Sequence, residues 1–240
     1  MKKLMTVAIS AFSAAVAFGD VVSSDVVGYS QSDLRSGFAP AGAQFVSVSG
    51  TGINIQDITV VGYDGETAGD VDIQILDNLG RMTTQYFWVD LPDDDIYGWL
   101  DGDDEPADVT FQPGEGLWVN APNSDFKLQT AGKVPTSGVA VTLREGFKMV
   151  ANPTPVNVDI QDISISGYVG ETAGDVDIQI LDTLGRMVNQ YFWVDLPDDG
   201  IYGWLDGDDE PVEALIAPGA GLWVNAPSAE YSIVLPGVTL

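Results

Sequence analysis

The chain has 240 residues, with 36 Asp and Glu against 9 Lys and Arg, and its formal net charge at pH 7 is −27. Because such an acidic surface repels nucleic-acid phosphates and anionic membranes, we expect neither as a partner. The sequence has no His and no Cys. Histidine- or cysteine-based catalytic dyads and triads, thiolate metal sites and disulfides are therefore excluded.

The first 19 residues predict a secretory signal peptide. Two lysines precede an apolar segment, residues 4–16. Ala17 and Gly19 then place small residues at positions −3 and −1 relative to a cleavage site before Asp20. The apolar segment is too short to span a membrane. We therefore expect a secreted or cell-surface protein, with the periplasm as the alternative, and no membrane insertion after cleavage.

A long internal repeat dominates the remainder of the chain. Ile55–Pro122 and Ile160–Pro227 align without a gap at an offset of 105 residues, and about 53 of the 68 positions are identical. A period of this length suits a whole small domain rather than a solenoid repeat. We expect two units, residues 20–134 and 135–240, which arose by tandem duplication and are joined through the Pro- and Gly-containing stretch Ala131–Gly138.

Within each unit the hydrophobic pattern has the period of a β-strand. In Asp70–Asp77 (DVDIQILD) apolar and polar residues alternate, and residues 83–90 (TTQYFWVD) alternate in the same way. Asn78–Arg81 (NLGR) lies between them and predicts a hairpin turn in which Gly80 adopts a positive φ. The second unit repeats this pattern, with TLGR as the turn.

Other segments predict further short strands. PGEGLWVNAP (Pro113–Pro122) reads as a Gly-rich turn followed by a strand, and each unit closes on a last strand. INIQDI and VDIQDI fit either a strand or one helical turn. No stretch keeps a 3.6-residue period long enough for a substantial helix. The predicted fold class is all-β: two tandem repeats of a small β-sandwich or partly open barrel after a signal peptide.

Four motifs carry a resemblance to a known group of proteins. They are SSDVVGY after the signal peptide, GFKMVANP (Gly146–Pro153), QILDNLGR with its copy QILDTLGR, and PGEGLWV with its copy PGAGLWV. The chain resembles secreted β-module proteins of unknown function from the Verrucomicrobia, Lentisphaerae and Kiritimatiellae lineages. In the first unit, GAQFVSVSG (Gly42–Gly50) takes the place of GFKMVANP. The resemblance implies location and fold class, and no chemistry.

Each unit carries an acidic loop that is a candidate calcium site. Hard cations take six to eight oxygen ligands, which clustered carboxylates on a turn supply. The spacing is not that of an EF-hand loop. A solvated acidic loop without metal is the alternative interpretation. The candidate ligands are Asp101, Asp103, Asp104 and Glu105 in the first unit and Asp206, Asp208, Asp209 and Glu210 in the second.

The repeated aromatic residues are candidate ligand-binding residues. Exposed rings on a strand face would stack against the apolar faces of sugar rings. The alternative is that they form the core or pack between the units. Because Phe87 and Trp88 point to opposite faces of one strand, one ring of that pair is expected at an interface, in a cleft or under a loop. The candidates are Tyr86, Trp88, Trp99 and Trp118 in the first unit and Tyr191, Trp193, Trp204 and Trp223 in the second.

The sequence favours a protein that is not an enzyme. Carboxylate pairs perform glycoside hydrolysis, but a chain with 36 acidic residues contains such pairs by chance. We expect a secreted structural or surface-association protein whose units pack through edge strands and aromatic faces. The alternative is a calcium-assisted carbohydrate-binding module. Calcium is the candidate cofactor, and glycans or copies of the chain itself are the candidate partners.

Overall fold

The computed structural model describes residues 27–34, 36–42, 52–62, 71–91, 93, 96–122, 125–167, 176–182, 186–228 and 230–238. The predicted signal peptide lies outside these residues. The fold is all-β, as predicted, and the helical elements of the described part are short 3-10 turns. The described residues contain no helix long and apolar enough to cross a membrane.

The two units have corresponding strands. Those of the first unit are β1 (Val27–Asp33), β2 (Gly37–Gly42), β3 (Ile53–Asn54), β4 (Thr59–Val61), β5 (Asp72–Leu76), β6 (Met82–Leu91), β7 (Ile96–Leu100), β8 (Thr110–Phe111), β9 (Gly116–Ala121) and β10 (Lys127–Lys133). Those of the second are β11 (Val139–Thr142), β12 (Gly146–Ala151), β13 (Val158–Asp159), β14 (Ser164–Ser166), β15 (Asp177–Leu181), β16 (Met187–Leu196), β17 (Ile201–Leu205), β18 (Leu215–Ile216), β19 (Gly221–Ala226) and β20 (Ser232–Leu235).

Each unit combines a five-stranded, a three-stranded and a two-stranded antiparallel sheet. In the first unit the orders are β2-β9-β5-β6-β7, β1-β10-β4 and β3-β8. The second unit has the same orders in the corresponding strands, β12-β19-β15-β16-β17, β11-β20-β14 and β13-β18. A separate cluster of buried apolar side chains lies inside each unit. Each unit is therefore a small sandwich with its own core.

The predicted correspondence between the units is wrong at one place. In the first unit Phe38 of β2 pairs with Asn120, and in the second Phe147 of β12 pairs with Asn225. GFAPAG (Gly37–Gly42) therefore takes the place of GFKMVA, and Gly42–Gly50 does not. The sequence alignment missed this because the offset changes from 105 to 109 residues before β3, where the segment after β2 is longer in the first unit.

The hairpin turn between β5 and β6 forms as predicted, and Asp77 organises it. One Asp77 carboxyl oxygen accepts hydrogen bonds from the backbone N–H groups of Leu79 and Arg81, both at 2.9 Å. The other oxygen binds the Arg81 guanidinium, with Nη2 at 2.7 Å. Gly80 adopts the expected positive φ of 74°. These contacts hold the pKa of Asp77 down at about 2, chiefly through the hydrogen bond from the Arg81 side chain. The predicted turn at Gly185 lies outside the described residues.

The ambiguous segment INIQDI contains both predicted structures. Strand β3 runs directly into a 3-10 turn, η1 (Ile55–Asp57), and η3 (Ile160–Asp162) repeats it in the second unit. The turn positions the side chain of Gln56 beside strand β7. Gln56 Nε2 donates to the carbonyl oxygens of Trp99, at 2.7 Å, and Ala107, at 2.9 Å, while its Oε1 accepts from the Trp99 N–H. Gln161 makes the same three bonds in the second unit.

This side-chain clamp explains a glycine in the stretch Gln85–Pro106, which recurs almost unaltered as Gln190–Pro211 and is called the cassette below. Gly98 has a φ of 126°, and a Cβ atom at this position would collide with Gln56 Oε1. The clamp also occupies backbone groups on the outer edge of β7, which would otherwise be open to pairing with another chain. Since the second unit has the same clamp, neither β7 nor β17 offers a fully unpaired edge at its centre.

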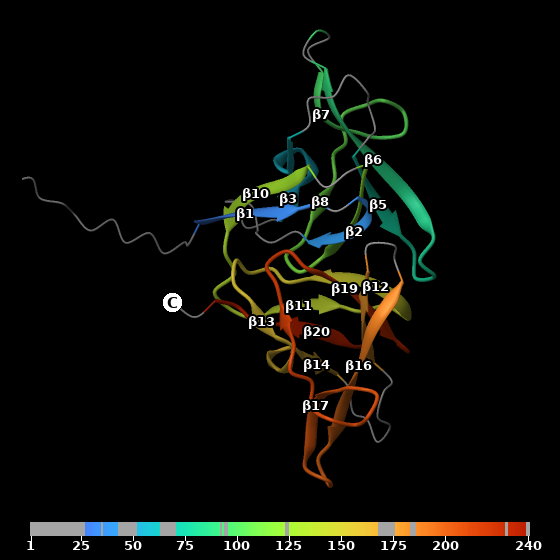
Figure 1. Ribbon diagram of the computed structural model, residues 1–240, viewed down its shortest axis with the longest axis vertical. Coiled ribbons are helices and arrows are strands. Elements are labelled where there is room, and N and C mark those ends of the chain that lie inside the picture. The colour runs from blue at the N-terminus through green and yellow to red at the C-terminus, as the bar shows by residue number, and fades with distance from the viewer. Residues whose placement is uncertain are drawn as a thin grey trace, which may run out of the picture.

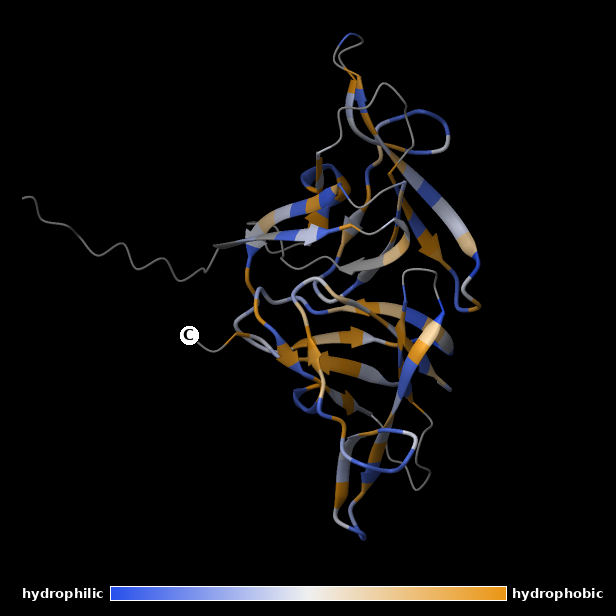
Figure 2. Ribbon diagram, in the orientation of Figure 1, coloured by the Kyte–Doolittle hydropathy of each residue, from blue (hydrophilic) through white to orange (hydrophobic). Residues whose placement is uncertain are grey.

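The units are arranged end to end along the longest axis of the molecule, with β6–β7 toward one end and β16–β17 toward the other (Figure 1). The loops near both ends are strongly hydrophilic (Figure 2). The middle of the molecule is formed by β2 and β9 of the first unit, which contact β12 and β19 of the second. The predicted boundary between residues 134 and 135 stays a prediction. Val134 packs in the first core, and Val238 near the C-terminus returns to pack against the same core.

Candidate functional site

Four of the eight predicted ligand-binding aromatic residues belong to the cores, so their assignment to a ligand face is wrong. Trp88 and Trp99 expose at most 1% of their surface and meet edge to face with ring centroids 5.4 Å apart. Trp193 and Trp204 are equally buried in the second unit. The physical reason is that a small sandwich without disulfides needs large apolar groups to fill its core. The Trp99 indole N–H is anchored on the Ile58 carbonyl oxygen at 2.7 Å.

Tyr86 and Tyr191 occupy an intermediate position. Both are partly buried and pack against the core of their own unit. Tyr86 also lines a cavity of about 350 Å³ between the units. Phe87, the neighbour of Trp88, is partly buried on the other face of β6. One ring of the pair is therefore in the core and the other is outside it, as their alternation predicts.

The last two predicted aromatic residues meet between the units. Trp118 on β9 and Trp223 on β19 contact each other edge to face, with ring centroids 5.8 Å apart. Phe38 stacks on Trp118 at 5.9 Å, and Phe147 lies 5.3 Å from Trp223. Both tryptophans are only partly buried. They are the pair that the structure leaves near solvent, and they sit where corresponding faces of the two units come together.

Backbone hydrogen bonds reinforce this interface. The N–H groups of Phe147 and Ala151 on β12 donate to the carbonyl oxygens of Asn78, at 3.0 Å, and Gly114, at 2.9 Å, in the first unit. Arg144 joins the contact through Nη2, which donates to the Leu76 carbonyl oxygen at 2.8 Å. An edge strand and aromatic faces thus hold the units together within one chain. Gly146 permits the approach, since a Cβ atom there would lie 2.5 Å from the Asn78 oxygen.

A buried carboxylate organises the sheet face beside each interface tryptophan. Asp72 is only 2% exposed, although the strand pattern placed it on the polar face. Its two oxygens accept hydrogen bonds from Gln74 Nε2, at 2.9 Å, and Asn120 Nδ2, at 2.8 Å. Asp177 in the second unit is bound in the same way and also accepts from Gln190 Nε2, at 3.1 Å. Sequence reasoning missed these residues, because a polar residue alternating with isoleucines predicts an exposed one.

Cavities lie around the paired tryptophans. The smaller, of about 350 Å³, is lined by Trp118, Trp223 and Tyr86 together with charged residues that include Lys148 and Glu115. Burial lowers the pKa of Lys148, and the Glu115 charge partly opposes that shift. A second cavity, of about 510 Å³, shares both tryptophans and is lined by apolar and amide side chains. Volumes of this size fall within the range of small-molecule sites, about 300–1,000 Å³.

The acidic loops are tight turns in which one carboxylate binds the backbone of its own loop. Asp101 Oδ1 accepts from the N–H groups of Asp103, at 2.9 Å, and Glu105, at 3.1 Å. Asp104 adopts a left-handed φ of 60°. Asp206, Asp208, Asp209 and Glu210 repeat this arrangement in the second unit.

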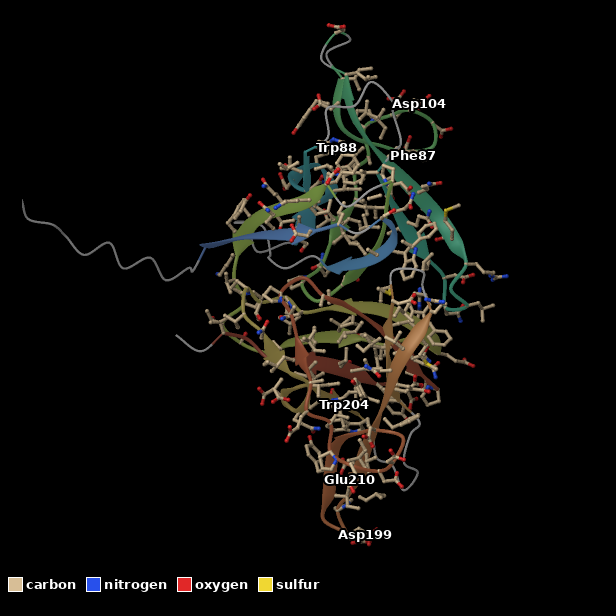
Figure 3. All side chains as sticks on the ribbon, viewed as in Figure 1. Phe87, Trp88, Asp104, Asp199, Trp204 and Glu210 are labelled. Carbon is tan, nitrogen blue, oxygen red and sulfur yellow. The ribbon has the colours of Figure 1, made fainter. Side chains whose placement is uncertain are left out.

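The carboxylates of these loops do not converge on a common point. Asp103, Asp104 and Glu105 are exposed, and the loops lie toward the two ends of the molecule (Figure 3). Within the described ranges, no group of three or more acidic side chains is arranged to hold a metal ion. Calcium binding at these loops therefore stays a prediction.

Comparison with known protein families, curated proteins and solved structures finds no match to this chain.

Proposed function

We propose that the protein is a secreted, non-enzymatic surface-association protein with two equivalent attachment ends. We define the first tip as Ile96, Tyr97 and Asp101–Glu105, and the second tip as Ile201, Tyr202 and Asp206–Glu210. Since Trp88 and Trp99 are buried, the exposed part of each repeated cassette is its tip. The observation that carries the proposal is that strands β7 and β17, which carry the same exposed side chains, lie toward opposite ends of one molecule (Figure 1).

Each tip presents two exposed apolar side chains, which point to opposite faces of strand β7 or β17. Tyr97 is 64% exposed and Tyr202 is 65% exposed, and Ile96 and Ile201 are 39% and 40% exposed. Exposed apolar side chains of this size provide the contacts that the proposed attachment needs. The tyrosine rings are also held in place, since Tyr97 packs edge to face on Trp88 with ring centroids 5.0 Å apart. A ring that is already fixed loses little entropy on binding.

Two such ends give the molecule the geometry for bivalent attachment. The interface of Trp118 and Trp223, with the hydrogen bonds of β12, joins the units into one body. When both ends bind one surface, the second contact forms at a high effective concentration, which raises avidity by about 10²–10⁴. The duplication would then increase attachment strength without any new kind of contact.

The chemistry of the described carboxylates supports a non-enzymatic role. The most buried aspartates, Asp72 and Asp177, are engaged by amide side chains. The acids of the tips are exposed on loops, where they lack the enclosed cleft that glycoside hydrolysis requires.

The direct test is retention of the protein on cells that secrete it. We compare the wild type with a variant in which Ile96, Tyr97, Ile201 and Tyr202 are all changed to Ser. We expect the wild type to fractionate with the cell surface and the variant to appear in the medium. As control, the equally exposed Val188 and Leu215, at 55% and 65%, are changed to Ser. Equal retention of wild type and tip variant would refute the proposal.

A calcium-assisted carbohydrate-binding module is the second candidate function. The partly exposed pair of Trp118 and Trp223 supports its carbohydrate component. Its calcium component rests on the acidic loops alone. Calcium that binds only the folded state at a hundredfold excess over Kd would stabilise it by about 2.7 kcal/mol. Thermal melting with millimolar Ca²⁺, against chelator at matched ionic strength, tests this component. An equal effect of Na⁺ would reject it.

A further inference from the structure

The larger of the two cavities at the paired tryptophans presents the same groups twice. It has a volume of about 510 Å³ and lies between the outer faces of the two five-stranded sheets. Corresponding residues of both units line it, so whatever binds there meets two similar half-sites. The corresponding pairs are Trp118 and Trp223, Gln74 and Gln179, Leu76 and Leu181, and Met82 and Met187.

The polar groups of this cavity are two amides that buried aspartates hold in place. Gln74 Nε2 donates to Asp72 Oδ1 at 2.9 Å, and Gln179 Nε2 donates to Asp177 Oδ1 at 2.9 Å. Using one N–H in this way fixes the direction of the other N–H and of the carbonyl oxygen of each amide. A fixed donor next to a fixed acceptor matches a sugar hydroxyl, which both donates and accepts.

The apolar groups of the cavity are suited to ring stacking. Trp118 and Trp223 are partly buried, and their edge-to-face arrangement turns the two indole planes at 66° to each other. The face of an indole carries partial negative charge, and the C–H groups on the face of a pyranose ring carry partial positive charge. Phe38 and Phe147 already pack against the two indoles, so two consecutive rings of an oligosaccharide would lie against the parts of the indoles that these rings leave uncovered.

The charge of the site favours a neutral ligand. The side chains that line the larger cavity are uncharged, whereas the chain as a whole has a net charge of −27. The field of such a protein repels anionic glycans. We propose that this cavity binds a neutral oligosaccharide, with one ring against each tryptophan and each glutamine amide bonded to hydroxyl groups. The proposal rests on the surface-association function and adds a glycan contact in the middle of the molecule to the contacts made by the two tips.

The test uses the full mature chain in affinity electrophoresis. The probes are a soluble neutral glucan, a neutral galactomannan and an anionic polyuronate. Met187→Trp places an indole at the rim of the cavity, where Met187 is 53% exposed. Val188→Trp is the matched control, because Val188 is 55% exposed and does not line the cavity. We expect a neutral polysaccharide to retard the wild type and Val188→Trp equally and to bind Met187→Trp about tenfold more weakly or not at all.

A second variant guards against misfolding of the first. Gln179→Met removes one amide, and Asp177 keeps the hydrogen bonds from Gln190 and Asn225. This variant should melt as a folded protein and lose about tenfold in affinity. Three outcomes would overturn the proposal: no neutral polysaccharide binds, the polyuronate binds equally well, or the Met187→Trp and Gln179→Met variants both bind like the wild type. If wild-type protein stays on cells without binding a neutral polysaccharide, the glycan site is wrong and surface association stands. If the wild-type protein neither stays on cells nor binds a neutral polysaccharide, both the surface-association function and the glycan site are refuted.

Discussion

Trp118 and Trp223 occupy corresponding positions in the two units, and their indole rings meet edge to face with centroids 5.8 Å apart. The two residues belong to strands with the same partners in sheets of the same order. Their contact therefore brings corresponding faces of the two units together. One sequence motif, GLWVNA, thus supplies a core residue pattern on one face and half of an interface on the other.

The contact between these rings should contribute to the stability of the whole chain. Trp118→Ala removes a partly buried indole and its packing against Phe38 and Trp223, so we expect a loss of about 2–3 kcal/mol in the free energy of unfolding. Urea denaturation followed by circular dichroism measures it. Tyr29→Ala, at a residue 58% exposed, serves as control and should change stability by less than about 0.5 kcal/mol. An unchanged denaturation midpoint in Trp118→Ala would show that the interface is not a stabilising one.

The Gln56 clamp should be among the most sensitive polar positions. Gln56→Ala deletes three hydrogen bonds and leaves buried backbone groups around Trp99 without them, which costs about 2–3 kcal/mol. Thermal denaturation measures the effect. Gln31→Ala is the control, since Gln31 is exposed and its side chain accepts a hydrogen bond from Gln129 Nε2. If both variants melt alike, the clamp is not a structural requirement.

The turn aspartate predicts a defined pH dependence. The folded-state pKa of Asp77, about 2, lies below its ordinary value of 3.8, so the carboxylate favours the folded state above pH 3.8. That contribution is lost as the pH falls from 3.8 toward 2. An NMR titration of the Asp77 carboxyl carbon should give a midpoint near 2 in the wild type and a return toward 3.8 in Arg81→Gln. A wild-type midpoint near 3.8 would contradict the turn geometry.

The signal peptide gives a prediction about the mature chain. The small residues of Ala17–Gly19 after the apolar segment predict cleavage before Asp20. Intact-mass spectrometry of protein recovered outside the cytoplasm should give a chain that starts at or near Asp20. Recovery of a chain that still carries Met1 would contradict secretion by this route.

Local structure could be predicted well from the sequence, because alternation and turn residues act over short distances. The strands on both sides of Asn78–Arg81 and the positive φ of Gly80 follow from these signals. The role of Gln56 could not be predicted in this way. Its partners, Trp99 and Ala107, are 43 and 51 residues away, and no pattern indicates such a distant hydrogen bond.

The candidate site was predicted only in part, because the same tryptophan-rich pattern serves two environments. Trp88 and Trp118 both alternate with apolar residues in strands, yet one is buried in a core and the other lies between units. Which face of a strand meets the second unit depends on how the units dock, and the docking depends on β12 and the turn at Asn78. The high identity of the copies also hid the functional positions, since nearly all cassette residues recur, whatever their role.

The rate at which the protein leaves a cell surface tests the central claim, attachment through two equivalent tips. We compare the wild type with variants in which Ile and Tyr are changed to Ser at the first tip, at the second tip, or at both. Bivalent attachment predicts that either single-tip variant dissociates about 10²-fold faster than the wild type, and that the two single-tip variants behave alike. Dissociation of both single-tip variants at the wild-type rate, or loss of attachment from only one of them, would contradict the claim.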